Sequence, residues 1–331
     1  MPSVIVAGAS GYAGALAARL IWQHPEFDLV AVTAREDAGR ALSDLYPHHR
    51  VPLELEALDL DRAASADAAI VAYPHGSAAP VVASLLEREL RVIDLSADFR
   101  LRDRATYERW YVPHEHPELI ERAVYGLTEL YRAQISAAAL VACPGCFPTA
   151  AILALAPLAQ AGLIADAVID AKTGVSGMGK APKDANHFVT VTENVRPYGV
   201  GAHRHMPEID QELALLGAPV PVTFTSHLLP IDQGELLSCY VTTTRAVEQA
   251  ELDGLYAARY ADEPFVDLVA TPPGVRDVRE TNVCAISAVA DERTGKVFVF
   301  AAIDNLWKGT SSQALANLNL MFGYDEGLGL R

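Results

Sequence analysis

Short apolar runs alternate with helix-length amphipathic segments through the first half of this 331-residue chain. Apolar runs of four to eight residues are typical of strands that are buried on both faces of a parallel sheet. Strands that alternate with helices in this way predict a doubly wound parallel sheet with right-handed crossovers. The expected strands are residues 4–7, 29–33, 69–72, 92–95 and 140–142, and the expected helices between them are residues 12–24 and 78–89.

The pattern changes after about Pro148, where an apolar helix leads into longer strand-like segments. In one of these, Leu237, Cys239 and Val241 alternate with polar or amphipathic residues, which indicates a sheet with one solvated face. This half is therefore predicted to be an α+β domain. Its expected helix is residues 149–161, and its expected strands are 168–172, 221–225, 235–243, 284–290 and 297–303.

A last helical pattern follows Gly309 and is expected to pack back on the first domain. The predicted fold class is thus α/β, with a Rossmann-type sheet and a second domain built on a mixed or antiparallel sheet. The expected division is 1–147 for nucleotide binding and 148–308 for catalysis and dimerisation. Residues 309–331 are expected to return to the first domain.

Composition and charge exclude several classes of partner. The chain is 51% hydrophobic and 21% charged, as soluble globular proteins are. Its net charge of −16 repels phosphate backbones and anionic lipid, so neither nucleic acid nor a membrane is an expected partner. The chain begins without a basic leader, and four cysteines in this length are too few for a disulfide scaffold. We therefore expect a cytoplasmic protein.

A glycine-rich turn joins the first expected strand to the first helix. Gly8, Gly11 and Gly14 have the spacing that lets a chain turn tightly and approach a pyrophosphate, which the helix N-terminus then holds. The motif alone also fits an ordinary tight turn, but its position between strand and helix favours a dinucleotide site. The predicted contacts are Gly8, Ser10, Gly11, Tyr12, Ala13 and Gly14.

The end of the second expected strand bears on which cofactor binds. An NAD site usually has an acidic residue there, which binds the ribose 2′-hydroxyl. This strand ends instead with Thr33, followed by Arg35, and the first acidic residues come later. These side chains suit a 2′-phosphate and predict NADP(H) as cofactor; the alternative is that Arg35 is only a surface charge.

Cys146 is the candidate nucleophile. It follows a Pro-Gly turn, and Pro148 suits the first turn of a helix, so the thiol is expected at a helix N-terminus. The helix dipole favours a thiolate there. Cys143 is treated as a strand-end residue with no required role; mild oxidation would link it to Cys146 if the sulfurs can approach. A zinc site lacks a second cysteine pair, so no metal is expected, and a thiol–disulfide oxidoreductase would need both cysteines.

A basic cluster and two loops complete the candidate chemistry. His203, Arg204 and His205 precede the expected helix that contains Glu208, where they can supply a proton donor and an anion anchor. Ser176 and Gly177 lie in a glycine-rich loop that suits phosphate. Ser96 and Arg100 follow another strand, at the edge where ligands bind. His48 and His49 are expected to face solvent, and Cys239 and Cys284 to be structural.

Taken together, these segments resemble the N-acetyl-gamma-glutamyl-phosphate reductase family of arginine biosynthesis, which is related to aspartate-semialdehyde dehydrogenase. Pro-Gly-Cys before an aromatic residue and Pro-Thr, His-Arg-His, and Asp-Asn-Leu-x-Lys-Gly form a specific combination. The matching pieces occur in the family's order from end to end. They are residues 8–14, 94–100, 144–149, 173–177, 203–209 and 304–309.

The resemblance implies a reaction and roles for particular residues. It implies that the Cys146 thiolate attacks an acyl phosphate, that the thioester is reduced with NADPH to an aldehyde, and that Asn305 lies near the nicotinamide. His205 or His203 protonates the oxygen, and backbone N–H groups hold the oxyanion. The substrate contacts expected besides these are Arg100, Ser176, Gly177, Arg204 and Glu208.

The resemblance leaves some points open. It implies a homo-oligomer, a dimer or commonly a tetramer. The chain departs from the family at Cys143, which is usually Asn, and at Thr310-Ser311-Ser312, usually Ala-Ala-Gly. Related enzymes of lysine biosynthesis, which act on a carrier-linked aminoadipyl phosphate, share most motifs but tend to lack the proline before Gly-Cys. Pro144 and Pro148 therefore favour the acetylglutamyl substrate without excluding the other. A non-catalytic NADP-binding regulator is the remaining alternative.

Overall fold

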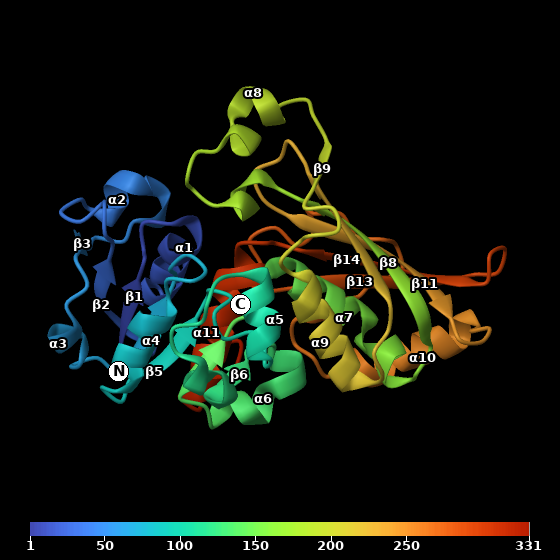
Figure 1. Ribbon diagram of the computed structural model, residues 1–331, viewed down its shortest axis with the longest axis horizontal. Coiled ribbons are helices and arrows are strands. Elements are labelled where there is room, and N and C mark those ends of the chain that lie inside the picture. The colour runs from blue at the N-terminus through green and yellow to red at the C-terminus, as the bar shows by residue number, and fades with distance from the viewer. Residues whose placement is uncertain (331) are drawn as a thin grey trace. The chain divides into compact units, whose positions relative to one another are not determined.

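The computed structural model describes residues 1–330, and the chain forms two compact units. Unit 1 contains Met1–Gly145 and Thr310–Arg331, and unit 2 contains Cys146–Gly309. Each unit has a sheet of its own (Figure 1).

Unit 1 is built on a seven-stranded sheet in which every strand pair is parallel. The strand order is β3-β2-β1-β4-β5-β7-β6. β1 lies between β2 and β4, so the strand order reverses there, and ligands of such sheets bind at this point. The strands are β1 (Ser3–Ala7), β2 (Asp28–Thr33), β3 (Leu55–Glu56), β4 (Ala68–Val71), β5 (Arg91–Asp94), β6 (Ala123–Tyr125) and β7 (Leu140–Ala142).

Helices cover this sheet, and the last of them comes from the end of the chain. All ten residues of that helix, α11, are buried, and it packs on α1, α6 and β5. Gln313 and Asn317 each donate to the Gly126 carbonyl at 2.9 Å, which fixes α11 in place. The helices are α1 (Tyr12–Trp22), α2 (Leu42–Leu45), α3 (Leu60–Ala63), α4 (Ala79–Leu86), α5 (Arg104–Trp110), α6 (Thr128–Ser136) and α11 (Ser312–Met321).

Unit 2 is built on a mixed seven-stranded sheet of order β12-β13-β14-β11-β8-β10-β9. Two pairs are parallel, β8 with β10 and β12 with β13, and the other pairs are antiparallel. The strands are β8 (Ile164–Thr173), β9 (Arg196–Tyr198), β10 (Val222–Leu228), β11 (Glu235–Thr243), β12 (Val266–Leu268), β13 (Cys284–Asp291) and β14 (Lys296–Ile303).

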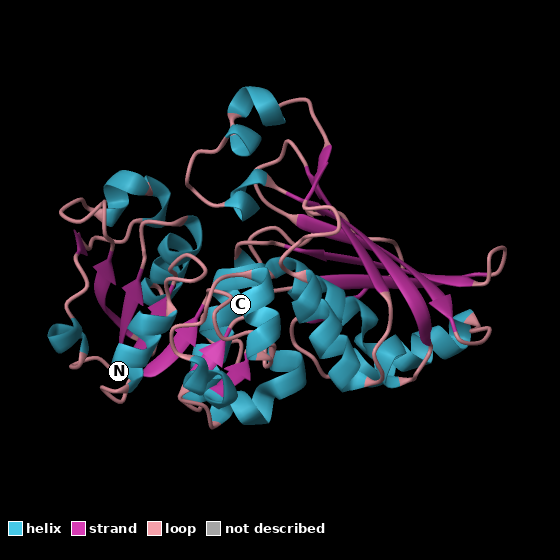
Figure 2. Ribbon diagram, in the orientation of Figure 1, coloured by secondary structure: helices cyan, strands magenta, loops and turns pink. Residues whose placement is uncertain are grey.

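Three longer helices gather on one face of this second sheet: α7 (Cys146–Gln160), α9 (Met206–Leu216) and α10 (Gln249–Tyr260) (Figures 1 and 2). α7 is apolar all round and is buried from Phe147 to Ala159. Pro157 lies inside it and cannot donate to the Leu153 carbonyl. The Tyr260 hydroxyl of α10 donates to that carbonyl instead. A residue of α10 thus satisfies the acceptor that Pro157 leaves without its usual helical donor.

The fold class predicted from the sequence is confirmed: a parallel doubly wound sheet and a second, mixed sheet. Every predicted strand is present, with ends displaced by at most a few residues. The expected solvent exposure of His49 was wrong. Its ring is buried and stacks on Tyr46 at 5.3 Å, and burial lowers its pKa to about 4. In residues 1–330, helices of the length and apolarity needed to cross a membrane do not occur.

Candidate functional site

In unit 1, the glycine turn has the close backbone approach that a dinucleotide site requires. Gly8 has a φ of +88°, and a Cβ there would lie 2.6 Å from the Ala72 oxygen. A Cβ on Gly14 would lie 2.3 Å from the Gly8 oxygen. The Gly8 and Ala9 amides donate to the Thr33 carbonyl at 3.0 and 2.8 Å, which joins the turn to the end of β2. The turn therefore accepts only glycine at these two positions.

The side chains around this turn fit a phosphate-bearing cofactor. The Arg35 guanidinium lies 5.1 Å from the centre of the Tyr73 ring, and the same ring borders Gly8. The Thr33 hydroxyl is buried and has no hydrogen-bond partner among residues 1–330. Ser10 and Ala13 are bonded through their carbonyls: Ser10 accepts from the Tyr46 hydroxyl at 2.9 Å, and Ala13 from Ser311 at 2.8 Å. Ser311, one of the departures from the family pattern, thus supports the start of α1.

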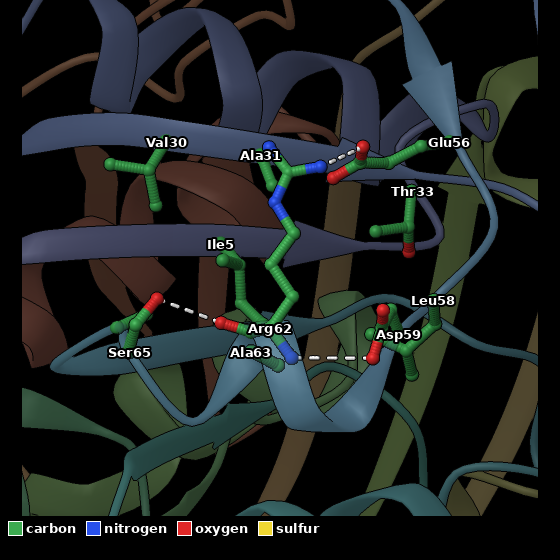
Figure 3. Close-up of a pocket in the computed structure, with 11 residues that line it drawn as sticks. Ile5, Val30, Ala31, Thr33, Glu56, Leu58, Asp59, Arg62, Ala63 and Ser65 are labelled. Atoms are coloured by element: carbon green, nitrogen blue, oxygen red, sulfur yellow. Dashed lines mark hydrogen bonds and ion pairs between the residues drawn. The ribbon is translucent and has the colours of Figure 1, made fainter.

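A cavity opens beside Thr33, between β1, β2 and the segment that contains α3 (Figure 3). Apolar and polar residues both line it, and its polar residues other than Thr33 interact with one another. Arg62 forms an ion pair with Glu56, and its backbone amide donates to Asp59 at 3.2 Å. Ser65 donates to the Arg62 carbonyl at 2.8 Å. We therefore assign this cavity no ligand.

The loop after β5 holds Ser96 and Arg100 inside unit 1. The Ser96 hydroxyl donates to Asp94 at 2.7 Å and accepts from the Asp98 amide at 3.0 Å. Arg100 donates to the carbonyls of Cys143 and Leu95 at 2.6 and 2.9 Å, which joins the ends of β5 and β7. Both side chains thus support the edge of the sheet, and their contacts with cofactor or phosphate stay predictions.

Cys143 has the surroundings of a structural cysteine. Its thiol is fully buried and accepts a hydrogen bond from the Asn317 amide at 3.4 Å. Burial raises its pKa to about 12, so almost none of it is thiolate at neutral pH. Because disulfide formation proceeds through a thiolate, this burial disfavours the oxidative linkage of Cys143 to Cys146, which stays a prediction.

Cys146 is the first residue of α7, and its side chain is only partly buried. The 15-residue helix places the positive end of its dipole at this sulfur. Gly309 packs closely against Cys146, because a Cβ on this glycine would lie 2.8 Å from the Cys146 Cβ. The Asp304 side chain accepts from the amides of Leu306 and Trp307 at 2.9 and 3.2 Å, which shapes the loop that ends at Gly309. The structure thus holds an accessible thiol in one position.

The histidine cluster packs beside this cysteine through its neighbour. The Phe147 ring lies 5.4 Å from His203 and 6.0 Å from His205. The His205 amide donates to His203 Nδ1 at 3.2 Å, so Nε2 carries the proton of the neutral His203 ring. Burial, and then the charge of Arg204, lowers the His203 pKa to about 4. At neutral pH, His203 is therefore an uncharged hydrogen-bond donor.

Two other residues that are expected to contact the substrate, Arg204 and Glu208, lie at the N-terminal end of α9. Arg204 is exposed, as an anchor for a substrate carboxylate must be. Glu208 is buried on the inner side of α9. The structure thus keeps Arg204 as an expected anion contact, whereas Glu208 faces the interior of unit 2.

The Ser176 loop is joined to Asn305. The Asn305 amide nitrogen donates to the Ser176 hydroxyl at 3.1 Å, and its oxygen accepts from the Gly234 amide at 2.7 Å. Gly177 lies beside the same side chain. Asn305 is thus held at both ends, and it fixes the loop that the sequence assigns to phosphate.

Glu235 was missed in the sequence. It begins β11, is 0% exposed, and interacts with the Cys146 side chain. Burial raises its pKa to about 8; Cys146 favours the charged form, and Asp304 opposes it. The sequence pattern could have indicated this residue, because Glu235 shares the inward-facing positions of its strand with Leu237, Cys239 and Val241. A carboxyl in such a series is unusual and indicates a function.

Two family models match this chain. Residues 146–305 match the dimerisation domain of semialdehyde dehydrogenase, and residues 3–138 match its NAD binding domain.

Curated relatives match over the full length. The N-acetyl-gamma-glutamyl-phosphate reductase of Moorella thermoacetica is 48% identical over 98% of this chain and 96% of its own. That of Geobacter sulfurreducens is 47% identical over 100% and 98%.

Solved structures share the fold. Aspartate semialdehyde dehydrogenase II of Vibrio cholerae, complexed with ASA, has a TM-score of 0.75 at 15% identity and covers 98% of both chains. The Candida albicans enzyme with NADP has a TM-score of 0.71 at 13% identity, over 97% of this chain and 98% of its own.

Proposed function

This chain belongs to the semialdehyde dehydrogenase family and, within it, to the N-acetyl-gamma-glutamyl-phosphate reductases, and we propose that it carries out the reaction for which those relatives are named. It reduces N-acetyl-L-glutamyl 5-phosphate to N-acetyl-L-glutamate 5-semialdehyde and phosphate, a step of arginine biosynthesis. The reaction proceeds through a thioester on Cys146.

One observation carries this proposal: the accessible Cys146 thiol at the N-terminus of α7. The other three cysteines are buried. Only Cys146 combines access with the field of a long helix, which favours the thiolate that attacks a carbonyl. The thiolate displaces phosphate from the acyl carbon, and the N-terminal turn of α7 favours the developing oxyanion.

Neighbouring side chains of unit 2 bind and orient the substrate. The Ser176 loop, fixed by Asn305, binds the phosphate. His203 donates a hydrogen bond from Nε2 to the oxygen of the acyl group, and His205 shares the Phe147 contact and is the alternative donor. Arg204 binds a substrate carboxylate.

The cofactor is a nicotinamide dinucleotide, and we propose NADPH. Gly8 and Gly14 give the close approach that its pyrophosphate needs, and Arg35 with Thr33 suits a 2′-phosphate. When bound, the cofactor supplies the hydride that reduces the thioester. Arg35→Ser is expected to weaken NADPH binding about tenfold and NADH binding little, measured by fluorescence titration. Equal effects on both cofactors would contradict this assignment.

The direct test is the reverse reaction. Purified protein is mixed with N-acetylglutamate semialdehyde, NADP and phosphate, and the absorbance of NADPH is followed. Parallel reactions use aspartate semialdehyde and an aminoadipate-type semialdehyde. Phosphate-dependent NADPH formation with the acetylated substrate supports the proposal. A preference for the aminoadipate-type substrate would favour the lysine-pathway reaction, and cofactor binding without turnover would favour a regulator.

We further propose that the protein is a homo-oligomer of the cytoplasm, with the open face of the second sheet as its interface. The helices gather on the other face, and Val168 and Tyr240 on the open one are 37% and 38% exposed. Tyr240 pairs with Phe298 across β11 and β14, with their rings 5.5 Å apart. Light scattering is expected to show at least a dimer, and Tyr240→Lys a smaller species. An unchanged mass would contradict this interface.

A further inference from the structure

Glu235 has surroundings that few carboxyl groups in proteins have. Both of its oxygens are buried, and no backbone amide among residues 1–330 donates to them. A buried carboxylate normally needs such donors, because burial disfavours its charged form. A buried carboxyl without such amide donors, beside a thiol, indicates a group that keeps a proton for part of the time and exchanges it with a neighbour.

The strand register places Glu235 beside the nucleophile. Glu235 is opposite Ile303 in the pairing of β11 with β14. A point beside Gly309, where a Cβ would lie, is 3.3 Å from Ile303 Cδ1 and 2.8 Å from Cys146 Cβ. The Ile303 and Cys146 side chains thus both lie close to this point. The interaction of the Cys146 side chain with the Glu235 carboxyl agrees with this placement.

The same residue borders the Ser176 loop on its other side. Glu235 is opposite Thr173 in the pairing with β8, and the Gly174 amide donates to the Gly234 carbonyl at 3.0 Å. The Ser176 amide donates to the Asp232 carbonyl at 3.0 Å. Asn305 bonds both Gly234 and Ser176. Glu235 therefore neighbours both the thiol and the loop that is proposed to bind the phosphate.

We propose that Glu235 is a catalytic proton carrier, which takes the proton of the Cys146 thiol and delivers it to the departing phosphate. This inference rests on the proposed function. The sulfur forms a bond to the acyl carbon while the bond from that carbon to the phosphate oxygen breaks. The electron pair of the broken bond stays on the phosphate oxygen, which receives the proton from Glu235. Glu235 is left as a carboxylate, and the thiolate that is released when the aldehyde forms takes a proton from water, so that both groups return to their starting state.

The acidity of this carboxyl suits both transfers. A carboxyl with an ordinary pKa is too weak a base to take a proton from a thiol, whereas burial raises the pKa of Glu235 to about 8. The ionisable groups that face it are Cys146 of α7, Tyr198 of β9 and Asp304 after β14. A doubly charged phosphate that binds in the Ser176 loop adds to the repulsion from Asp304 and further favours the protonated acid.

Glu235→Gln separates this role from a structural one. Glutamine has the size of the protonated carboxyl and still offers a hydrogen bond to the sulfur, so it keeps the thiolate but has no proton to transfer. Two reactions are compared at pH 8. Phosphate-dependent oxidation of the semialdehyde needs proton transfer. The first acylation by p-nitrophenyl acetate does not, because nitrophenolate leaves as an anion.

We expect Glu235→Gln to lower phosphate-dependent turnover about 100-fold or more, while the nitrophenolate burst stays within about threefold of the unchanged protein. Glu235→Asp keeps a transferable proton and is expected to retain more turnover than Glu235→Gln. Equal loss of both reactions, loss of neither, or an Asp variant less active than the Gln variant would overturn the proton-carrier role. If the unchanged protein has no phosphate-dependent turnover, the proposed function itself fails.

Discussion

Two buried carboxyl groups, one in each unit, differ in almost every respect but burial. Asp98 of unit 1 is 1% exposed, and its side chain accepts from the amides of Gly76, Ala78 and Ala79 at 2.7, 3.0 and 3.1 Å. The Tyr107 hydroxyl adds a fourth hydrogen bond at 2.9 Å. Glu235 of unit 2 is equally buried, has no such amide donors within residues 1–330, and lies beside a thiol.

The difference shows how one side-chain chemistry serves two purposes. Four donors bind the Asp98 carboxyl, which ties the loop after β4 to the loop after β5 and to α5. Glu235 lacks this support, so its proton equilibrium lies near neutral pH, where proton transfer costs least. Burial alone therefore does not identify a functional carboxyl, whereas burial without donors beside a nucleophile does.

Replacing the nucleophile beside Glu235 is expected to lower turnover more than any other change. Cys146→Ser is expected to lower turnover by several orders of magnitude, because a serine hydroxyl is far less ionised at this position. Cofactor affinity, measured by fluorescence titration, is expected to stay within about twofold. Cys143→Ser is the matched control and keeps the nucleophile. Near-normal turnover of Cys146→Ser would eliminate the thioester route.

The second effect is on folding and belongs to the Asp98 region. Asp98→Ala leaves three amides, two of them buried, and one buried hydroxyl without their acceptor, so it is expected to lower the free energy of unfolding by about 4 kcal/mol. Denaturant titration measures this value. Asp103→Ala, which removes an exposed helix cap instead, is expected to cost much less. A similar small loss in both variants would show that Asp98 is not a structural centre.

A third effect concerns the placement of the thiol next to Glu235. Gly309→Ala adds a methyl group where only 2.8 Å separates it from the Cys146 Cβ. The sulfur must then move, and a displacement of about 1 Å is expected to reduce turnover roughly 100-fold. Gly254→Ala is the control for the glycine change, because a Cβ there meets no atom within 4 Å and the residue has no positive φ. Full turnover of Gly309→Ala would show that the thiol position tolerates this shift.

The smallest effect is a pH dependence of stability. The folded protein keeps the Glu235 proton up to about pH 8, whereas the unfolded chain releases it near the ordinary value of 4.5. The stabilising contribution is therefore complete below pH 4.5 and is lost as the pH rises through 8. Between pH 5.5 and 7.5, unchanged protein is expected to lose about 2 kcal/mol relative to Glu235→Gln.

Unfolding titrations at both pH values measure this difference, and Glu115→Gln, at an exposed position, is the control. Parallel pH dependence in the unchanged protein and in Glu235→Gln would mean that this carboxyl ionises in the folded protein much as it does in the unfolded chain.

Periodicity predicted the parts of the fold that bury a continuous apolar face. The strands beside β1 and the long strands of unit 2 are of this kind, and so is α7. β3 and β12 have two and three residues and carry no period. α10 has polar residues on most of its surface and is fixed by Tyr256 and Tyr260, which bind α7 carbonyls far away in the sequence.

The parts of the candidate site that could be predicted are those in which neighbouring residues in the sequence already indicate the chemistry. The glycine turn, Cys146 at a helix start and the histidine cluster all follow from local sequence. The burial of His49 does not, because the Tyr46 ring that covers it is placed by the folded loop. Ser96 and Arg100 were predicted as ligand contacts, yet their observed partners are groups within unit 1, such as the Cys143 carbonyl. Glu235 was visible as a charge in an apolar series and was overlooked.

The central claim is a covalent bond between Cys146 and the acyl group. It is tested most directly by mixing the protein with N-acetylglutamyl phosphate in the absence of NADPH and measuring the intact mass. We expect a mass increase of one N-acetylglutamyl group per chain, located on the peptide with Cys146 and removed by hydroxylamine. Unmodified Cys146 in protein that turns over normally when NADPH is added would contradict it.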